Sequence, residues 1–233
     1  MSLKLKTDYF GLSGNGWSIA STTDNRSVTT AEANGEDGFL VAVESFGERI
    51  SPSCEYIAKD TATVSGIQLG KVMTVLGKSI ALGSVTITTK AGEVPTMTAQ
   101  GQQIEDNGTA HCTCTLSGIT VSGLYHAQDF GLFTISNGQL TESTLTIEGN
   151  IATAEVDGTI KSSDLTGGRV TVSGTVVGVT DAGAISTPSL SVGTPSGNIL
   201  PGVVTQPLSE TNPNGDFPTY SFTITWGLKA DTE

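Results

Sequence analysis

Strict alternation of apolar and polar residues is the feature that most constrains the fold of this chain. It recurs in SVTITT (84–89), TLTIEG (144–149) and RVTVSGTV (169–176). Successive side chains of a strand point to opposite faces, so this period of two predicts strands with one buried face. The clearest case is YSFTITWGL, where a single parity holds Tyr220, Phe222, Ile224, Trp226 and Leu228.

Glycine-containing dipeptides separate these segments and predict turns, several of them hairpins, because Asn, Asp and Gly accept positive φ. They are Asn34-Gly35, Asn107-Gly108, Asn137-Gly138, Asp157-Gly158 and Asn214-Gly215. The chain holds 29 Gly and only 36% hydrophobic residues, and it is rich in Thr and Ser, a composition that disfavours helices. We therefore predict an all-β fold, an antiparallel sandwich or barrel, with at most one short helix at Leu124–Phe130 (LYHAQDF).

One region departs from this pattern because it concentrates the prolines. Proline cannot donate a hydrogen bond to a sheet, so continuous pairing through 181–218 is not expected. We predict a core over 1–180, an extended arm over 181–218 and a terminal strand over 219–233 that returns to the core. The prolines of the arm are Pro188, Pro195, Pro201, Pro207, Pro213 and Pro218.

Negative charge is concentrated in the second part of the chain. The formal net charge is −12. Residues 1–90 hold eight Lys or Arg against nine Asp or Glu, whereas residues 91–233 hold three against fourteen, a balance of −11. This excludes binding of nucleic acid through clustered cations. It leaves solubility, repulsion of a polyanion or cation binding as interpretations.

Histidine and cysteine are too few to predict a metal or catalytic centre. His111-Cys112-Thr113-Cys114 lacks the second ligand cluster that structural zinc needs, so we expect Cys112 and Cys114 to be reduced, metal-free and turned toward a core. His126 has no identifiable partner for nucleophilic catalysis, and no G-x-S-x-G elbow is present. We predict no catalytic, metal or cofactor-binding residues, and no cofactor.

Carboxylates leave two weaker alternatives open. Acid pairs for glycoside hydrolysis depend on three-dimensional spacing, so a β-helical or jelly-roll hydrolase remains an alternative. Calcium is another, because clustered carboxylates could donate oxygens although no recognisable calcium loop is present. The candidate calcium ligands are Glu36, Asp37, Glu105, Asp106 and Asp216.

Three segments of the chain resemble structural proteins of tailed bacteriophages. The stretch 16–56, GWSIASTTDNRSVTTAEANGEDGFLVAVESFGERISPSCEY, resembles the start of small virion proteins. GEVPTMTAQGQQIE (92–105) is similar to a strand of tail tube and related tail proteins, and so is the closing YSFTITW (220–226). The resemblance covers much of the chain but contains no diagnostic motif.

The resemblance implies a non-enzymatic subunit of a phage tail tube, or of a related tail or baseplate part. Six copies would form a ring, rings would stack, and DNA would pass through an acidic lumen without specific binding. It implies a virion location after synthesis in the host cytoplasm, which fits the absence of a signal-peptide run in Met1–Leu12. We expect the arm to attach to the neighbouring subunit through Ile199, Leu200, Val203, Val204 and Leu208.

The competing hypothesis is a carbohydrate-binding or receptor-binding β-domain of a fibre or surface protein. Such sites commonly expose aromatic rings over a groove, and only 6% of this chain is aromatic. Phe222 and Trp226 are expected in the core. Trp17, in the glycine-rich GNGWSI, is the one aromatic residue whose context suggests exposure.

Overall fold

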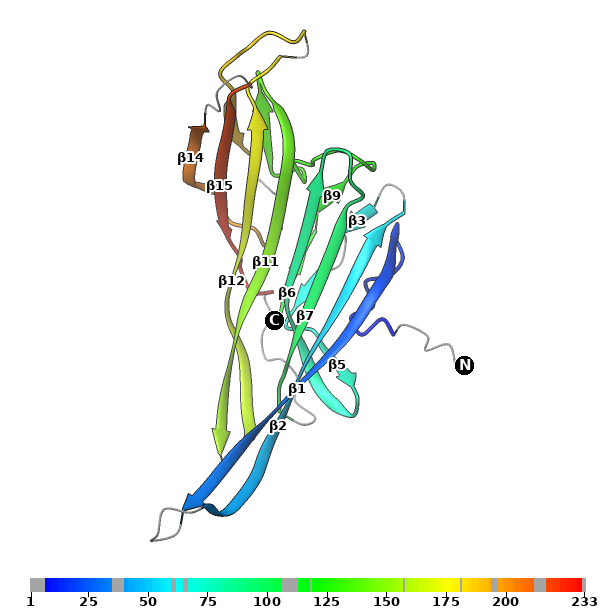
Figure 1. The fold of residues 1–233 in the computed structure, drawn as a ribbon, viewed down its shortest axis with the longest axis vertical. Helices are drawn as coiled ribbons and strands as arrows, with labels where there is room; N and C mark the ends of the chain where they lie inside the picture. The colour runs from blue at the N-terminus through cyan, green and yellow to red at the C-terminus, as the bar shows by residue number, and fades with distance from the viewer. Residues whose placement is uncertain are drawn as a thin grey trace.

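The computed structural model describes residues 7–34, 40–59, 62–64, 67–105, 113–117, 119–156, 158–180, 182–193, 197–211 and 217–231. Among these residues, every regular element is a β-strand. Figure 1 shows an elongated molecule. The strands are β1 (Trp17–Asn34), β2 (Leu40–Ala58), β3 (Ala62–Val64), β4 (Ile67–Leu69), β5 (Val72–Val75), β6 (Lys78–Lys90), β7 (Thr96–Gln103), β8 (Cys114–Leu116), β9 (Ile119–Val121), β10 (Phe133–Ser136), β11 (Gln139–Val156), β12 (Thr159–Val177), β13 (Ser189–Val192), β14 (Val203–Thr211) and β15 (Thr219–Gly227).

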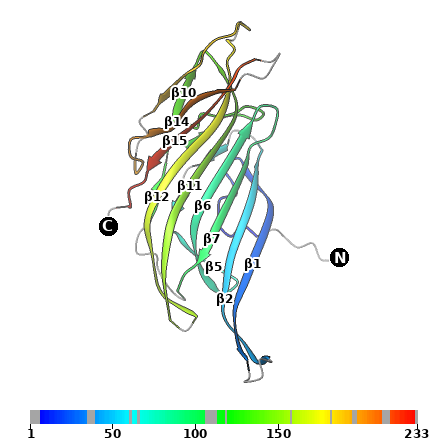
Figure 2. The ribbon, with the colours of Figure 1, turned by 60° about the vertical axis from the view of Figure 1, so that its left-hand side comes forward.

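One large antiparallel sheet forms the frame of the protein. Its strands run in the order β1-β2-β7-β6-β11-β12-β15-β14, and β5 pairs with the lower part of β6 (Figure 2). The sheet is open, with β1 and β14 at its two ends. The prediction of an all-β antiparallel fold is therefore confirmed. The described residues include no helix of the length and apolarity needed to span a membrane.

The inner face of this sheet is built by the alternating segments. Leu145 of β11 lies opposite Ile87 of β6, and Val172 of β12 lies opposite Ile224 of β15. All four side chains are fully buried. The predicted stripe of the last strand is confirmed as well, and burying its large apolar surface stabilises the sheet. Its members Phe222, Ile224 and Trp226 are at most 1% exposed.

A second layer of short strands covers this inner face. It consists of three two-stranded sheets, β4 with β8, β3 with β9, and β10 with β13. Phe133 of β10 meets Phe222 of β15 edge to face, with ring centroids 5.1 Å apart. Leu69 of β4 and Leu116 of β8 are fully buried. The core therefore lies between one large sheet and several small ones.

The predicted short helix at Leu124–Phe130 is wrong. This segment is an irregular loop in which Tyr125 and Phe130 take positive φ values of 67° and 56°. The backbone of this loop makes hydrogen bonds to side chains in place of the hydrogen bonds of a helix. The Gln128 amide donates to Thr89 Oγ1 (2.9 Å), and the Gln128 carbonyl accepts from Ser143 Oγ (2.6 Å). These buried hydroxyls give the loop the partners that a helix would otherwise provide.

Pairing through segment 181–218 is discontinuous, as expected, but two parts of it do form strands that pair with the rest of the chain. Strand β13 pairs with β10, and β14 pairs with β15. Pro207 lies inside β14, where the register is irregular between Gln206 and Ser209. An edge strand tolerates proline at such an irregularity because no neighbour needs that missing N–H.

The turn predictions have mixed outcomes. Gly158, with φ 70°, lies in the hairpin that joins β11 to β12, as predicted. Asn137 has φ 60° and turns the chain from β10 into β11, but these strands pair with others, so this turn is not a hairpin. The remaining pairs lie wholly or partly outside the described residues: Asn34-Gly35, Asn107-Gly108 and Asn214-Gly215.

Replacing Trp226 by alanine tests the packing of the last strand. The indole is fully buried and lies against Gly202, where an added Cβ would be 2.2 Å from Nε1. We expect Trp226→Ala to lower the free energy of unfolding by about 3–5 kcal/mol in urea titrations, through lost contacts and a cavity. Ser221→Ala, on the exposed face of the same strand, should change it by less than about 0.5 kcal/mol. Equal effects of the two variants would contradict the assigned faces.

Candidate assembly surfaces

The two ends of the large sheet are open strand edges. No other described strand pairs with the outer side of β1 or of β14. Edge strands present rows of backbone donors and acceptors and are templates for pairing with another chain. On β14, Val203 is 64% exposed and Val204 36% exposed. The sheet therefore offers two different edges, at opposite sides, to neighbouring molecules.

The far half of the β1–β2 hairpin extends beyond the rest of the sheet (Figure 1). Only Ser53–Ile57 of β2 pair with β7, so below this point the hairpin lacks a third strand among the described residues. All described side chains from Thr23 to Ala33, and from Ala42 to Ser45, are exposed. We call the part formed by residues 28–34 and 40–46 the free ribbon.

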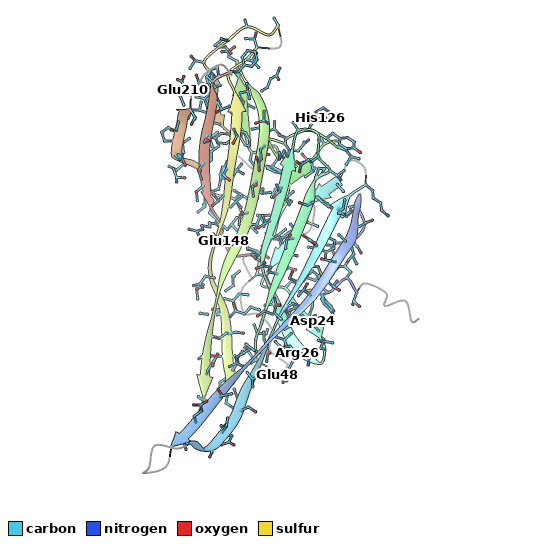
Figure 3. The ribbon with its side chains drawn as sticks, in the orientation of Figure 1. Asp24, Arg26, Glu48, His126, Glu148 and Glu210 are labelled. Atoms are coloured by element: carbon cyan, nitrogen blue, oxygen red, sulfur yellow. The ribbon has the colours of Figure 1, made fainter. Side chains whose placement is uncertain are left out.

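A brace connects the base of the free ribbon to the β11–β12 hairpin. Arg49 Nη2 lies 2.8 Å from Glu155 Oε2 and donates to the carbonyl of Gly158 (3.1 Å). Gly47, with φ 67°, allows close approach, because a Cβ there would lie 3.1 Å from the Gly158 oxygen. The free ribbon begins where this brace ends. Figure 3 shows Glu48 at this level of the molecule.

A carboxylate clamp fastens the N-terminal segment to the sheet. The Tyr56 hydroxyl donates to Asp8 Oδ1 (2.6 Å), and the amide of Gly11 donates to the same oxygen (2.9 Å). The amide of Ser13 donates to Asp8 Oδ2 (2.7 Å). Partial burial disfavours ionisation, but these hydrogen bonds outweigh it and hold the pKa of Asp8 below its usual value.

A second clamp fastens the C-terminal segment to β8. The hydroxyls of Thr113 and Thr115 donate to Asp231 Oδ2 at 2.7 and 2.8 Å, and the Thr115 amide donates to Oδ1 at 3.0 Å. Desolvation opposes the charge, yet these donors lower the pKa of Asp231. The first and last described segments are thus each held by an ionised carboxylate.

The outer face of the large sheet is dominated by hydroxyl groups. Its charged side chains are largely paired: Arg169 bonds to Glu148, and Lys90 Nζ lies 3.0 Å from Glu93 Oε1. Glu142 lies opposite Lys90 in the strand register. Each of these two cations therefore lies beside a carboxylate. The half-exposed threonines of this face are Thr86, Thr88, Thr98, Thr144, Thr146, Thr171, Thr175, Thr223 and Thr225.

The five predicted attachment residues do not form one surface. Ile199 is 6% exposed and belongs to the core, and Leu208 packs partly against it. The Leu200 amide bonds to the Gly227 carbonyl (2.9 Å), so this residue is engaged within the chain. Ile199 and Leu208 therefore contribute to the core of their own chain, while Leu200 is bonded through its backbone. Val203 and Val204 remain exposed on the β14 edge.

The residues with catalytic or metal-binding potential lie apart. Cys54 and Cys114 are buried and free, and burial, with a contribution from Asp231, raises the pKa of Cys114 to about 11. Such a thiol is protonated at neutral pH and is a poor nucleophile or metal ligand. His126 lies on an exposed loop (Figure 3), while His111 and Cys112 lie outside the described residues. No group of three or more His, Cys, Asp or Glu side chains among the described residues could hold a metal ion.

Among the candidate calcium ligands, only Glu105 is described, and it accepts a hydrogen bond from Ser163. The suggested exposure of Trp17 is wrong, because the indole is 4% exposed and belongs to the core. The strand pairings Trp17↔Ala58 and Gly14↔Trp17 hold it there. Its glycine-rich context is explained by Gly14 and Gly16, which have positive φ in the turn before β1.

Sequence reasoning missed the free ribbon and the brace. One signal was present: 21–34, STTDNRSVTTAEAN, lacks the alternating apolar residues of the core strands. A strand without an apolar face has no face to bury against its own core. The brace gave no signal, since Arg49 and Glu155 are more than one hundred positions apart.

The chain matches no protein-family model, and no curated protein sequence is significantly similar to it. The resemblance to phage tail proteins therefore remains a proposal.

Replacing Asp8 by asparagine tests the N-terminal clamp. Because the folded-state pKa of Asp8 lies below its unfolded value, its contribution to stability is present above the unfolded pKa and is lost as the pH falls through the folded pKa. We expect Asp8→Asn to cost about 1–3 kcal/mol near pH 7 and to flatten the loss of stability below about pH 4. Urea titrations from pH 2 to 7 measure both effects.

The matched control is Glu44→Gln, which neutralises an exposed carboxylate of the free ribbon. It should leave the free energy of unfolding at pH 7 within about 0.5 kcal/mol of the native chain. An unchanged pH profile in Asp8→Asn would show that the clamp contributes nothing to the stability of the fold.

Proposed function

We propose that this protein is a non-enzymatic structural subunit of a phage virion that assembles into closed hexameric rings, as in a tail tube. The observation that carries the proposal is the open sheet with two different edges, β1 and β14, at opposite ends of the strand order. Pairing of β14 of one copy with β1 of the next is a heterologous contact, and repeating such a contact closes a ring if the rotation fits.

The exposed side chains support lateral pairing at β14. Eight of its nine residues are exposed, Leu208 alone being half-buried, so this strand contributes little to its own core. Its exposed valines, Val203 and Val204, give an adjoining strand apolar surface to cover. A structural subunit of this kind acts through its surface. The described residues present no catalytic constellation that would call for an enzymatic function instead.

The charge supports passage of DNA without binding. A net charge of −12, with −11 after residue 91, repels phosphates instead of neutralising them. The described outer face of the sheet adds paired charges and hydroxyls, with Lys90 and Arg169 each beside a carboxylate. A tube wall made from such subunits would hold no cationic cluster on this face that could retain DNA.

The alternative is a carbohydrate-binding or receptor-binding module, and one hollow on the outer face bears on it. This hollow, of about 420 Å³, crosses β1, β2, β7, β6 and β11. Its lining includes Ser53, Ser84, Gln100 and Glu148 but no aromatic ring. With Trp17 buried, the described aromatic side chains give a sugar no stacking platform there. Assembly is therefore the better-supported function.

Electron microscopy and light scattering of the purified protein test the proposal. We expect rings or short tubes that grow with concentration, and a uniform ring diameter. A protein that stays monomeric at high concentration, and binds glycans on an array, would contradict the assembly function and favour the alternative.

A substitution on the β14 edge tests the lateral contact. Val203→Lys places a charge at an exposed edge position, and we expect ring formation to require at least about tenfold more protein while the monomer stays folded. Ser173→Lys, on the outer face of the central strand β12, is the control and should leave ring formation nearly unchanged. Equal assembly of both variants would show that β14 is not the lateral edge.

A further inference from the structure

Residues 7–13, the first described segment, cover part of the inner face of the large sheet and belong to no strand. We call this segment the strap. Its Phe10 is 2% exposed and fills a recess over Gly101 of β7, where an added Cβ would lie 2.9 Å from the ring. Ile80 of β6 borders the same recess. One aromatic side chain therefore anchors the strap over β6 and β7.

Side chains, and not paired backbones, make the hydrogen bonds that tie the strap to β2. The Tyr56 hydroxyl donates to Asp8 Oδ1 (2.6 Å), and the Cys54 thiol donates to the Thr7 carbonyl (3.8 Å). The strands beneath are held by continuous backbone pairing. A segment attached by a few side-chain contacts opens at a lower free energy than a paired sheet. The strap can therefore open while the sheet stays folded.

One carboxylate both folds the strap and fastens it. Asp8 Oδ1 accepts from the Gly11 amide (2.9 Å) and Oδ2 from the Ser13 amide (2.7 Å), so the strap turns around this side chain. Oδ1 also accepts the Tyr56 hydroxyl from the sheet. Hydrogen bonds to an ionised acceptor are stronger than those to a neutral one. Loss of the charge on Asp8 therefore weakens the turn and its attachment together.

The strap meets β1 at Gly14, which has a φ of 105° that residues with a side chain rarely adopt. Directly after it, Asn15 and Gly16 form a tight turn, closed by backbone hydrogen bonds between Gly14 and Trp17 (3.1 and 2.8 Å). The Lys59 amide donates to the Gly16 carbonyl (2.8 Å) and fixes this turn to β2. The turn therefore stays in place, and Gly14 is the pivot about which the strap moves.

Carboxylates are the groups facing the strap that change charge between neutral and acid pH. Burial raises the pKa values of Tyr56, Tyr9 and Cys54, so these three groups keep their protons. The nearby charged groups of β1, both labelled in Figure 3, are Asp24, which accepts from the Tyr9 hydroxyl (3.1 Å), and Arg26. Protonating the carboxylates weakens both tyrosine contacts. Both changes favour release of the strap.

We propose that residues 7–13 are an acid-operated strap, which swings away about Gly14 while the large sheet stays folded and uncovers Cys54 and the recess of Phe10. This device goes beyond the proposed assembly function and does not depend on it. The pKa of Asp8 is lowered in the folded chain, so the charged carboxylate holds the strap closed at neutral pH. The strap opens as the pH falls through that lowered pKa.

Thiol labelling measures the opening, because two buried free cysteines lie in different places. Cys54 lies beneath the strap, whereas Cys114 lies in β8 of the second layer. The native chain is labelled with dithiodipyridine, which reacts with thiols in acid, and peptide mass spectrometry gives the rate at each cysteine. Below about pH 3 we expect Cys54 to react at least about tenfold faster than Cys114, with the circular dichroism of the folded sheet retained.

A variant tests the same opening at neutral pH. Tyr56→Phe removes the hydroxyl that joins the sheet to Asp8, and should raise the labelling rate of Cys54 at least about tenfold and leave that of Cys114 unchanged. Tyr125→Phe, at a side chain 53% exposed on the loop after β9, is the matched control and should change neither rate. Equal rates at the two cysteines, in acid and in Tyr56→Phe, would show that only global unfolding exposes them and would overturn the strap.

Discussion

Pairing of backbone groups in one very large sheet is the constraint on which the rest of this structure depends. Along the order β1-β2-β7-β6-β11-β12-β15-β14, the six inner strands have a neighbour on both sides, whereas β1 and β14 have one. An open sheet cannot satisfy its own outer edges. Its alternating inner face buries one side of the strands, and the short strands of the second layer cover that side. Among the described strands, none pairs with the outer side of β1 or of β14.

Polar side-chain contacts fix the loops and the first and last described segments. Asp8 and Asp231 hold those segments through convergent donors, and the buried Thr89–Ser143–Gln128 cluster holds the loop after β9. The buried members of that cluster are satisfied by one another, so their burial is not destabilising. On this elongated body, exposed apolar side chains include Val203 and Val204 of the edge strand β14.

Part of the candidate site was accessible from the sequence. Val203 and Val204 were predicted as attachment residues and are exposed at an edge, but Ile199 and Leu208, predicted with them, help to fill the core. Composition could not distinguish the exposed residues from the buried ones, because all four are apolar. The exposure of each depends on which face of the irregular strand its side chain lies on. Proline spacing led to a similar error: Pro207 interrupts β14 without preventing its pairing with β15.

The sequence by itself determined the fold class and the buried faces, because strand side chains alternate and the apolar parity must turn inward. Phe222, Ile224 and Trp226 could be placed in the core from this rule alone. Strand order, the irregular loop at Leu124–Phe130 and the burial of Trp17 were decided by tertiary structure. These features depend on contacts between residues distant in the chain, such as Arg49 with Glu155, and local sequence pattern carries no information about such pairs.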